Sequence, residues 1–180
     1  MKLWTTLSRK IILNHSPYLK VEEHAVELPD GRVIENWPWV ITPDYVNVVA
    51  QTPDDAFVCF RQTKYASGMT LAPVGGYIEQ DEDPLLAAQR ELLEETGYVA
   101  DEWIALGHYA VDANRGVGTG HLYLARQARH SAETHADDLE EQELIVLGRA
   151  ELQAALHDGR FKILPHAAAI ALALLYLAKS

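Results

Sequence analysis

Four glutamates of this 180-residue chain are spaced so that a helix would gather three of them. If residues 84–96 are helical, each residue turns by about 100°, so Glu91, Glu94 and Glu95 share one face. Glu91 and Glu95 are then one turn apart, where like charges repel. Glu82 precedes the helix and can fold back to its start, where the helix dipole favours an anion. Crowded carboxylate oxygens of this kind suit a hard divalent cation such as Mg²⁺ or Mn²⁺.

The helix that positions these carboxylates has local start and stop signals. Asp83 is a typical N-cap residue, Pro84 suits the first helical position, and Gly97 suits the end. The same helical wheel predicts an apolar face opposite the glutamates, made of Leu85, Leu86, Leu92 and Leu93.

Arg90 lies beside the acidic face and can pair with Glu94, four residues further on. This pair would either hold a glutamate in position for a metal ion or be an ordinary ion pair on the surface. Gly75 and Gly76, before the helix, allow backbone to approach a metal ion or a phosphate closely, with a plain turn as the alternative.

The spacing of these residues matches a known motif, the Nudix box G-x₅-E-x₇-R-E-U-x-E-E-x-G-U, where U is a bulky apolar residue. Its positions are occupied in order by Gly76, Glu82, Arg90, Glu91, Leu92, Glu94, Glu95, Gly97 and Tyr98. The chain therefore resembles the Nudix hydrolases. Residues 46–79 and the order of the later elements are similar to the ADP-ribose pyrophosphatase-like branch of that family. The resemblance implies an α/β/α sandwich around a mixed β-sheet and hydrolysis of a nucleoside diphosphate linked to another group.

The resemblance also implies roles for particular residues. The expected metal ligands are Glu91, Glu95, Glu94 and the Gly75 carbonyl, with Glu82 acting more distantly. In the resembled branch the general base comes from a loop after the box. The acidic stretch of residues 139–144 lies at that position, which favours Glu141 or Glu143. A solvated charge run is the alternative for that stretch, and Glu94 is the alternative base.

Substrate contacts need positive charge and aromatic surface. Arg61 is similar to a basic residue that meets phosphates in related enzymes, and Arg115 lies on a glycine-rich loop that could close over a substrate. Trp39 could stack on a base, although a core or interface role is the alternative. Residues 112–114 stand where the branch commonly has a proline, so the resemblance leaves the group beyond the diphosphate open.

Composition narrows the class of protein. The formal net charge of −11 repels phosphate backbones and argues against DNA or RNA as partners. Cys59, the single cysteine, excludes an internal disulfide framework. We expect no secretory signal at the start of the chain and no membrane span, because the apolar run at residues 167–178 is shorter than the roughly 20 residues that a span needs. A cytoplasmic protein with one domain over residues 1–180 is the expectation.

The rest of the chain predicts an α+β fold. A hairpin over residues 21–36, with its turn at residues 29–31, lies in an N-terminal region (1–40) that we expect to support a homodimer. Further strands are predicted at residues 45–51, 56–62, 103–111, 121–125 and 144–147, and further helices at 149–157 and 165–178.

The leading hypothesis is a Mg²⁺-dependent hydrolase of ADP-ribose, a nucleotide sugar or a similar small diphosphate. One alternative is a Nudix pyrophosphohydrolase of nucleoside triphosphates or 5′-triphosphate RNA. The other is a catalytically silent Nudix domain that senses a nucleotide. The complete glutamate set argues against the silent domain, because a pure binder has no need of a repulsive cluster.

Overall fold

The computed structural model describes residues 2–132 and 142–179. Contacts between Cα atoms divide the chain into two compact units. The first unit comprises Met1–Asp44 and Tyr109–Thr119, and the second comprises Tyr45–His108 and Gly120–Ser180. The expectation of a single domain over residues 1–180 stays a prediction.

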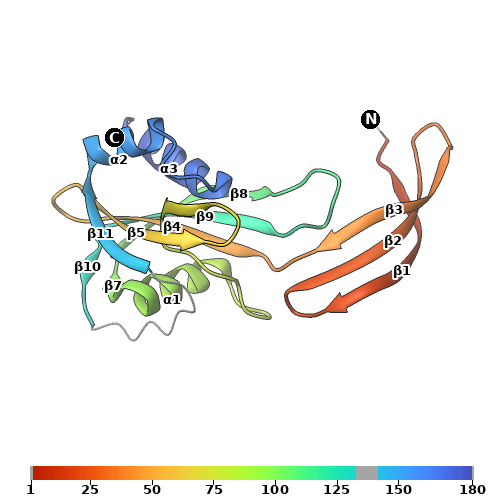
Figure 1. Ribbon diagram of the computed structural model, residues 1–180, viewed down its shortest axis with the longest axis horizontal. Coiled ribbons are helices and arrows are strands. Elements are labelled where there is room, and N and C mark those ends of the chain that lie inside the picture. The colour runs from red at the N-terminus through yellow and green to blue at the C-terminus, as the bar shows by residue number, and fades with distance from the viewer. Residues whose placement is uncertain (1, 133–141, 180) are drawn as a thin grey trace. The chain divides into compact units, whose positions relative to one another are not determined.

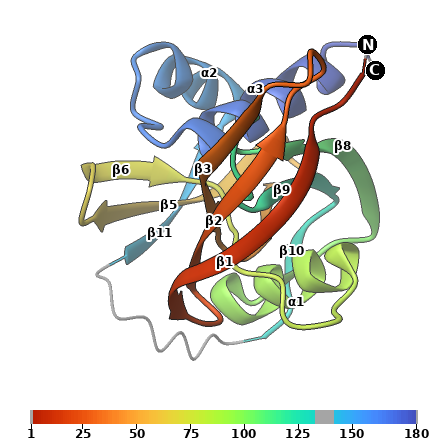
Figure 2. The same ribbon diagram turned by 90° about the vertical axis from the view of Figure 1, so that its right-hand side faces the viewer.

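The first unit contains a three-stranded antiparallel sheet, seen in Figure 2 with its strands in the order β1-β2-β3. The predicted hairpin is confirmed as β2 (Leu19–Glu27) and β3 (Val33–Ile41). Its turn is closed by a hydrogen bond from the Leu28 N–H to the Arg32 carbonyl at 2.8 Å. The third strand, β1 (Thr5–His15), is not predicted by the sequence pattern, and all of its residues are exposed.

The second unit is built on a six-stranded mixed sheet of order β11-β5-β4-β9-β8, with β6 paired to β5. β4 runs parallel to β9 and antiparallel to β5, and β11 is also antiparallel to β5. All of the predicted strands are present, and β6 is additional. The strands are β4 (Tyr45–Gln51), β5 (Ala56–Lys64), β6 (Gly68–Ala72), β8 (Glu102–Ala110), β9 (Thr119–Arg126) and β11 (Gln142–Gly148). A separate short pair joins β7 (Tyr98–Val99) to β10 (Arg129–His130).

Helices cover both faces of this sheet, with α1 (Pro84–Thr96) on one side and α2 (Arg149–His157) and α3 (Leu164–Leu177) on the other (Figure 1). Alternating side chains of the strands point to opposite faces. Val58 therefore packs in the core under α1, while Phe57 and Cys59 pack in the core under α3. Two cores on one mixed sheet confirm the predicted α/β/α sandwich.

The terminal apolar run forms α3, which spans Leu164–Leu177 and buries Ala169, Ile170 and Ala173 against the sheet. Within residues 2–132 and 142–179, none of the helices combines the length and the apolarity that a bilayer-spanning segment requires.

His166 on α3 makes stability depend on pH. Its Nδ1 is buried without a hydrogen-bond partner among the described residues, and burial together with nearby Lys64 lowers the pKa of the imidazole to about 4. The unfolded chain takes up a proton near pH 6.5, whereas the folded chain resists it. The free energy of unfolding should therefore fall by about 3 kcal/mol as the pH is lowered from about 6.5 to about 4.

Urea unfolding at a series of pH values measures this dependence. His166→Gln should flatten the pH profile over that range. His157→Asn, at a histidine on α2 whose side chain is 90% exposed, is the surface control for this substitution. A profile of the His166→Gln protein as steep as that of the wild type would contradict the assignment.

Candidate active site

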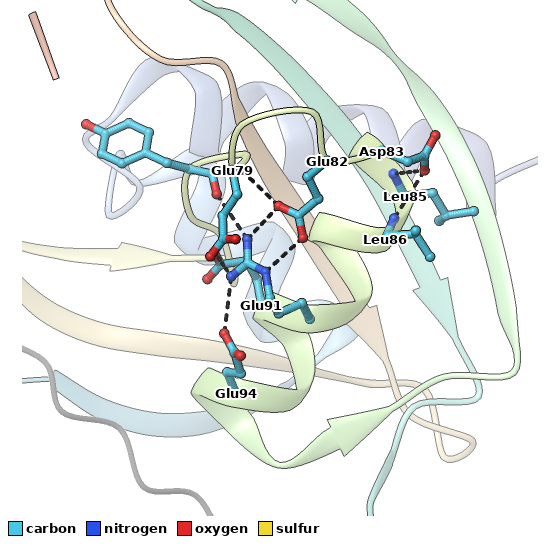
Figure 3. Close-up of polar contacts among 9 residues, drawn as sticks. Glu79, Glu82, Asp83, Leu85, Leu86, Glu91 and Glu94 are labelled. Carbon is cyan, nitrogen blue, oxygen red and sulfur yellow. Dashed lines mark hydrogen bonds and ion pairs between the residues drawn. The ribbon is translucent and has the colours of Figure 1, made fainter. Parts of the chain in front are cut away.

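Helix α1 begins and ends where the sequence predicts. The Asp83 carboxylate accepts hydrogen bonds from the backbone N–H groups of Leu85 and Leu86 at 2.9 and 3.2 Å (Figure 3). Gly97 adopts a left-handed φ of +70° and donates its N–H to the Leu93 carbonyl at 2.8 Å. These caps fix the rotation of the helix, and so the direction of each glutamate.

The predicted apolar face of α1 is wrong in two positions. Leu86 and Leu93 are 58% and 41% exposed, whereas Glu91 is only 9% exposed. The side that packs toward the sheet carries small residues, which bring the helix close to β4 and draw Glu91 inward with them. Its buried residues are Ala87, Ala88, Glu91, Leu92 and Thr96.

Arg90 gathers three glutamates around one guanidinium group (Figure 3). Its Nε and Nη2 bind the two oxygens of Glu82, both at 2.9 Å. Its Nη1 binds Glu91 at 2.7 Å and Glu94 at 3.1 Å. The predicted pair with Glu94 is therefore present, but it is one part of a network that also reaches the Tyr77 carbonyl at 3.1 Å.

The network affects the protonation of its members in opposite directions. Hydrogen bonds from Arg90 and from the Glu79 backbone lower the pKa of Glu82 to about 2. Burial raises the pKa of Glu91, against the opposing effect of Arg90. Glu91 is thus a desolvated carboxylate that depends on a cation, and Arg90 is the cation beside it.

The Gly75–Gly76 backbone lies against two carboxylates of α1. The Gly75 N–H donates to Oε2 of Glu95 at 3.3 Å. A Cβ on Gly76 would lie 2.3 Å from the carboxylate carbon of Glu91, so only glycine leaves room for that side chain. Glu91 and Glu95 therefore flank one stretch of backbone.

The carboxylates of Glu91, Glu94 and Glu95 and the carbonyl of Gly75 fit a hard divalent cation, because they offer only carboxylate and backbone oxygens. In the part of the chain that the structure describes, no three His, Cys, Asp or Glu side chains already converge as a metal site. Glu82, Glu91 and Glu94 converge instead on the guanidinium of Arg90.

The structure describes two of the three predicted general-base candidates, Glu143 and Glu94. Glu141 lies outside the described residues. Glu143 stands on β11 directly opposite Arg61 on β5, and its Oε2 pairs with Nη1 of Arg61 at 2.8 Å. Arg61 and Glu143 both line a cavity of about 380 Å³. Glu94, the alternative, is mostly exposed and held by Arg90.

The other two predicted substrate residues belong to the first unit. The guanidinium of Arg115 lies 5.1 Å from the ring centroid of Trp37. Trp39 stacks on His24 at 5.2 Å, and its ring packs against the Gly116 backbone.

Three residues of this region are missed by the sequence analysis. The backbone groups of Tyr77 and Glu79 anchor Arg90 and Glu82, and no side-chain pattern signals a backbone contact. Asn47 is 3% exposed on β4 and lines a cavity together with Gly75 and Gly76. A polar residue inside the apolar strand YVNVVAQ is the signal that could have drawn attention to it.

Comparison with known proteins gives two family matches. Residues 41–167 match the NUDIX domain, and residues 4–40 match the nucleoside diphosphate sugar hydrolase N-terminal domain. The NUDIX match covers the second unit up to residue 167, including α1 and the Gly75–Gly76 backbone.

The chain is also similar to individual proteins. A methanol dehydrogenase activator of Bacillus methanolicus is 31% identical over 77% of this chain and 74% of its own length. An ADP-ribose pyrophosphatase of Bacillus subtilis (strain 168) is 28% identical over 73% of this chain and 70% of its own length. The fold is similar to a crystal structure of an ADP compounds hydrolase, with a TM-score of 0.83, 20% identity, and coverage of 99% of this chain and 96% of the other. Nudix hydrolases generally depend on a divalent metal ion, and this chain belongs to the Nudix hydrolase family.

Proposed function

We propose that the chain hydrolyses the diphosphate bond of a nucleoside diphosphate derivative of the ADP-ribose or nucleotide-sugar type. The observation that carries the proposal is the arrangement around Gly75–Gly76. There a buried Glu91 and a partly buried Glu95 flank half-buried backbone while Arg90 fixes the neighbouring carboxylates. The N-terminal match to nucleoside diphosphate sugar hydrolases and the ADP-ribose pyrophosphatase relative favour this substrate class.

Mg²⁺ is the proposed metal, with Mn²⁺ as a substitute. Glu91, Glu95, Glu94 and the Gly75 carbonyl would hold it, and Glu82 would act through the arginine or through water. A bound divalent ion neutralises the phosphate oxygens and lowers the pKa of a water molecule. Arg90 prepares the site, because it orients Glu91 and Glu94 and offsets their charge.

A carboxylate has to take a proton from the attacking water. We assign this step to Glu143 or to Glu141, with Glu94 as the alternative. Glu143 is held by Arg61 across the β5–β11 ladder, so substrate binding to Arg61 would release the Glu143 carboxylate. Arg61 would bind phosphate, and Arg115 and Trp39 would supply further substrate contacts.

A substrate panel tests the proposal. ADP-ribose, ADP-glucose, UDP-glucose, ATP and a 5′-triphosphate RNA would be incubated with Mg²⁺, and the products identified by chromatography. We expect AMP or UMP from the first three and little release from the last two. Release of diphosphate from ATP or RNA would favour the triphosphate alternative, and nucleotide binding without turnover would favour a sensor. A cytoplasmic location accompanies the proposal, because a single buried cysteine suits a reducing compartment.

Gly76→Ala should lower kcat/KM on the preferred substrate by about 100-fold, because the added Cβ would displace the Glu91 carboxylate. Gly148→Ala is the matched control, since nothing lies within 4 Å of its added Cβ and its φ of −66° suits alanine. Steady-state kinetics of both proteins gives the comparison. Equal activity of the two variants would contradict the close packing at Gly76.

A homodimer through β1 is the second part of the proposal. β1 is an edge strand of its sheet and exposes several apolar side chains, which favours pairing with another copy. These side chains are Leu7, Ile11, Ile12 and Leu13. Light scattering should give twice the chain mass, and Ile11→Glu should give a monomer. A monomeric wild type at micromolar concentration would reject the dimer.

A further inference from the structure

A cavity of about 360 Å³ lies between α1 and the segment that runs from β7 into β8. Its walls are mostly apolar side chains, with two polar ones among them: Leu93, Val99, Ala100, Trp103, Gln89 and Arg90. Small-molecule sites in proteins have this size and this composition, with a few polar groups that fix the orientation of the ligand. A ligand in the cavity would cover Leu93, which is 41% exposed.

The cavity and the proposed metal ligands lie on opposite sides of α1. Gln89 precedes Glu91 by two residues, an interval that turns a helix by about 200°. Leu93 precedes Glu95 by the same interval. Glu91 and Glu95 lie against the Gly75–Gly76 backbone. A ligand in the cavity therefore occupies a separate site from a diphosphate bound at these carboxylates.

The charge around Arg90 favours a neutral ligand in this cavity. A guanidinium group has five N–H donors. Four of those of Arg90 bind the carboxylates of Glu82, Glu91 and Glu94, and the fifth binds the Tyr77 carbonyl. An anionic ligand would have to compete with these carboxylates for the arginine, whereas an uncharged one leaves the network intact.

Trp103 provides the cavity with a flat surface of fixed orientation. Its Nε1 donates to the Ala100 carbonyl at 3.2 Å, and its ring meets Tyr123 edge to face with 6.3 Å between the centroids. A side chain that is already held in place loses little conformational entropy when a ligand binds. Aromatic side chains stack on nucleobases in this way, because every base has a π-face.

Gln89 gives the cavity a means of distinguishing one base from another. A glutamine amide carries an acceptor and a donor side by side. Adenine presents the complementary pair, the N6 amino group and N7, so glutamine can make two hydrogen bonds with that edge at once. Hypoxanthine presents two acceptors on the same edge, O6 and N7, and can make only one of the two bonds.

We propose that this cavity binds the adenine ring of a nucleoside ligand other than the hydrolysed substrate. Trp103 is the stacking surface, and Gln89 is the residue that recognises the ring edge. The inference goes beyond the proposed function, because binding at this site requires neither a diphosphate nor a metal ion.

Adenosine is the probe, because it carries the ring and no phosphate. It would be titrated without divalent ions into protein labelled with ¹⁵N at tryptophan, and the indole N–H signals followed by NMR. The chain has four tryptophans, and the signal that is missing from the Trp103→Phe protein belongs to Trp103. We expect this signal to shift on addition of adenosine, and inosine to bind with a Kd about 10-fold higher.

Gln89→Leu should raise the Kd for adenosine by about 10-fold, to the value for inosine. Gln153→Leu is the matched control, since Gln153 is also an exposed glutamine on a helix, and it should leave the Kd unchanged. A Trp103 signal that does not move, or equal Kd values for adenosine and inosine in the wild type, would overturn the inference. Adenosine contains no diphosphate, so the titration gives its result whether or not the protein hydrolyses the proposed substrates.

Discussion

Replacing Glu95 by glutamine should lower kcat on the preferred diphosphate by a factor on the order of 10³, and replacing Glu91 by glutamine should have a similar effect. Glutamine keeps the size of the side chain but removes the charge that a divalent ion requires. Both carboxylates flank the Gly75–Gly76 backbone, so neither can substitute for the other. Steady-state kinetics over a range of Mg²⁺ concentrations measures the loss.

Glu79→Gln is the matched control for this experiment. Glu79 is exposed and lies beside the Arg90 network. Its backbone N–H donates to Glu82 at 2.9 Å. Its substitution should leave kcat within about twofold of wild type, because its side chain takes no part in the arrangement. Full activity of the Glu95→Gln protein would remove the proposed metal ligands.

Replacing Arg90 by lysine should reduce both activity and stability. One ammonium group cannot hold three carboxylates in the geometry of a guanidinium. Glu91 would then be a buried charge without its partner, at a cost of about 2–3 kcal/mol in the free energy of unfolding. Activity should fall by about 10–100-fold, because Arg90 orients the ligands and does not itself meet the metal.

Thermal unfolding and kinetics of the Arg90→Lys protein give both quantities. Arg129→Lys is the control, since Arg129 also makes a two-pronged pair, with Asp101, but both side chains are more than half exposed. An exposed pair of this kind should contribute less than about 1 kcal/mol. Equal melting temperatures of the two variants would contradict the central role of Arg90.

The sequence predicts most accurately the features that depend on residues close together in the chain. Asp83, Pro84 and Gly97 act on the backbone within one turn of their own positions, and α1 begins and ends as they indicate. The same is true of β4 and β5, whose apolar residues supply both cores because the sheet is covered on two sides.

Tertiary packing decides the features that the sequence does not reveal. Helical spacing predicts that Glu91 is exposed with Glu94, yet Glu91 is buried, because the small side chains of Ala87 and Ala88 let α1 approach β4. The pairing of Arg90 with Glu82, eight residues away, depends on how the loop before the helix folds back. β1 is missed because its exposed side chains show no regular alternation, and it is held in its sheet by the ladder with β2.

The most direct test of the account is the position of a divalent ion in a crystal of the wild-type protein. Crystals soaked with Mn²⁺ and α,β-methylene-ADP would be measured at the manganese absorption edge. We predict an anomalous peak coordinated by the carboxylates of Glu91 and Glu95 and by a phosphate oxygen. Bound nucleotide with no peak beside these two glutamates, or with a peak held only by other residues, would contradict it.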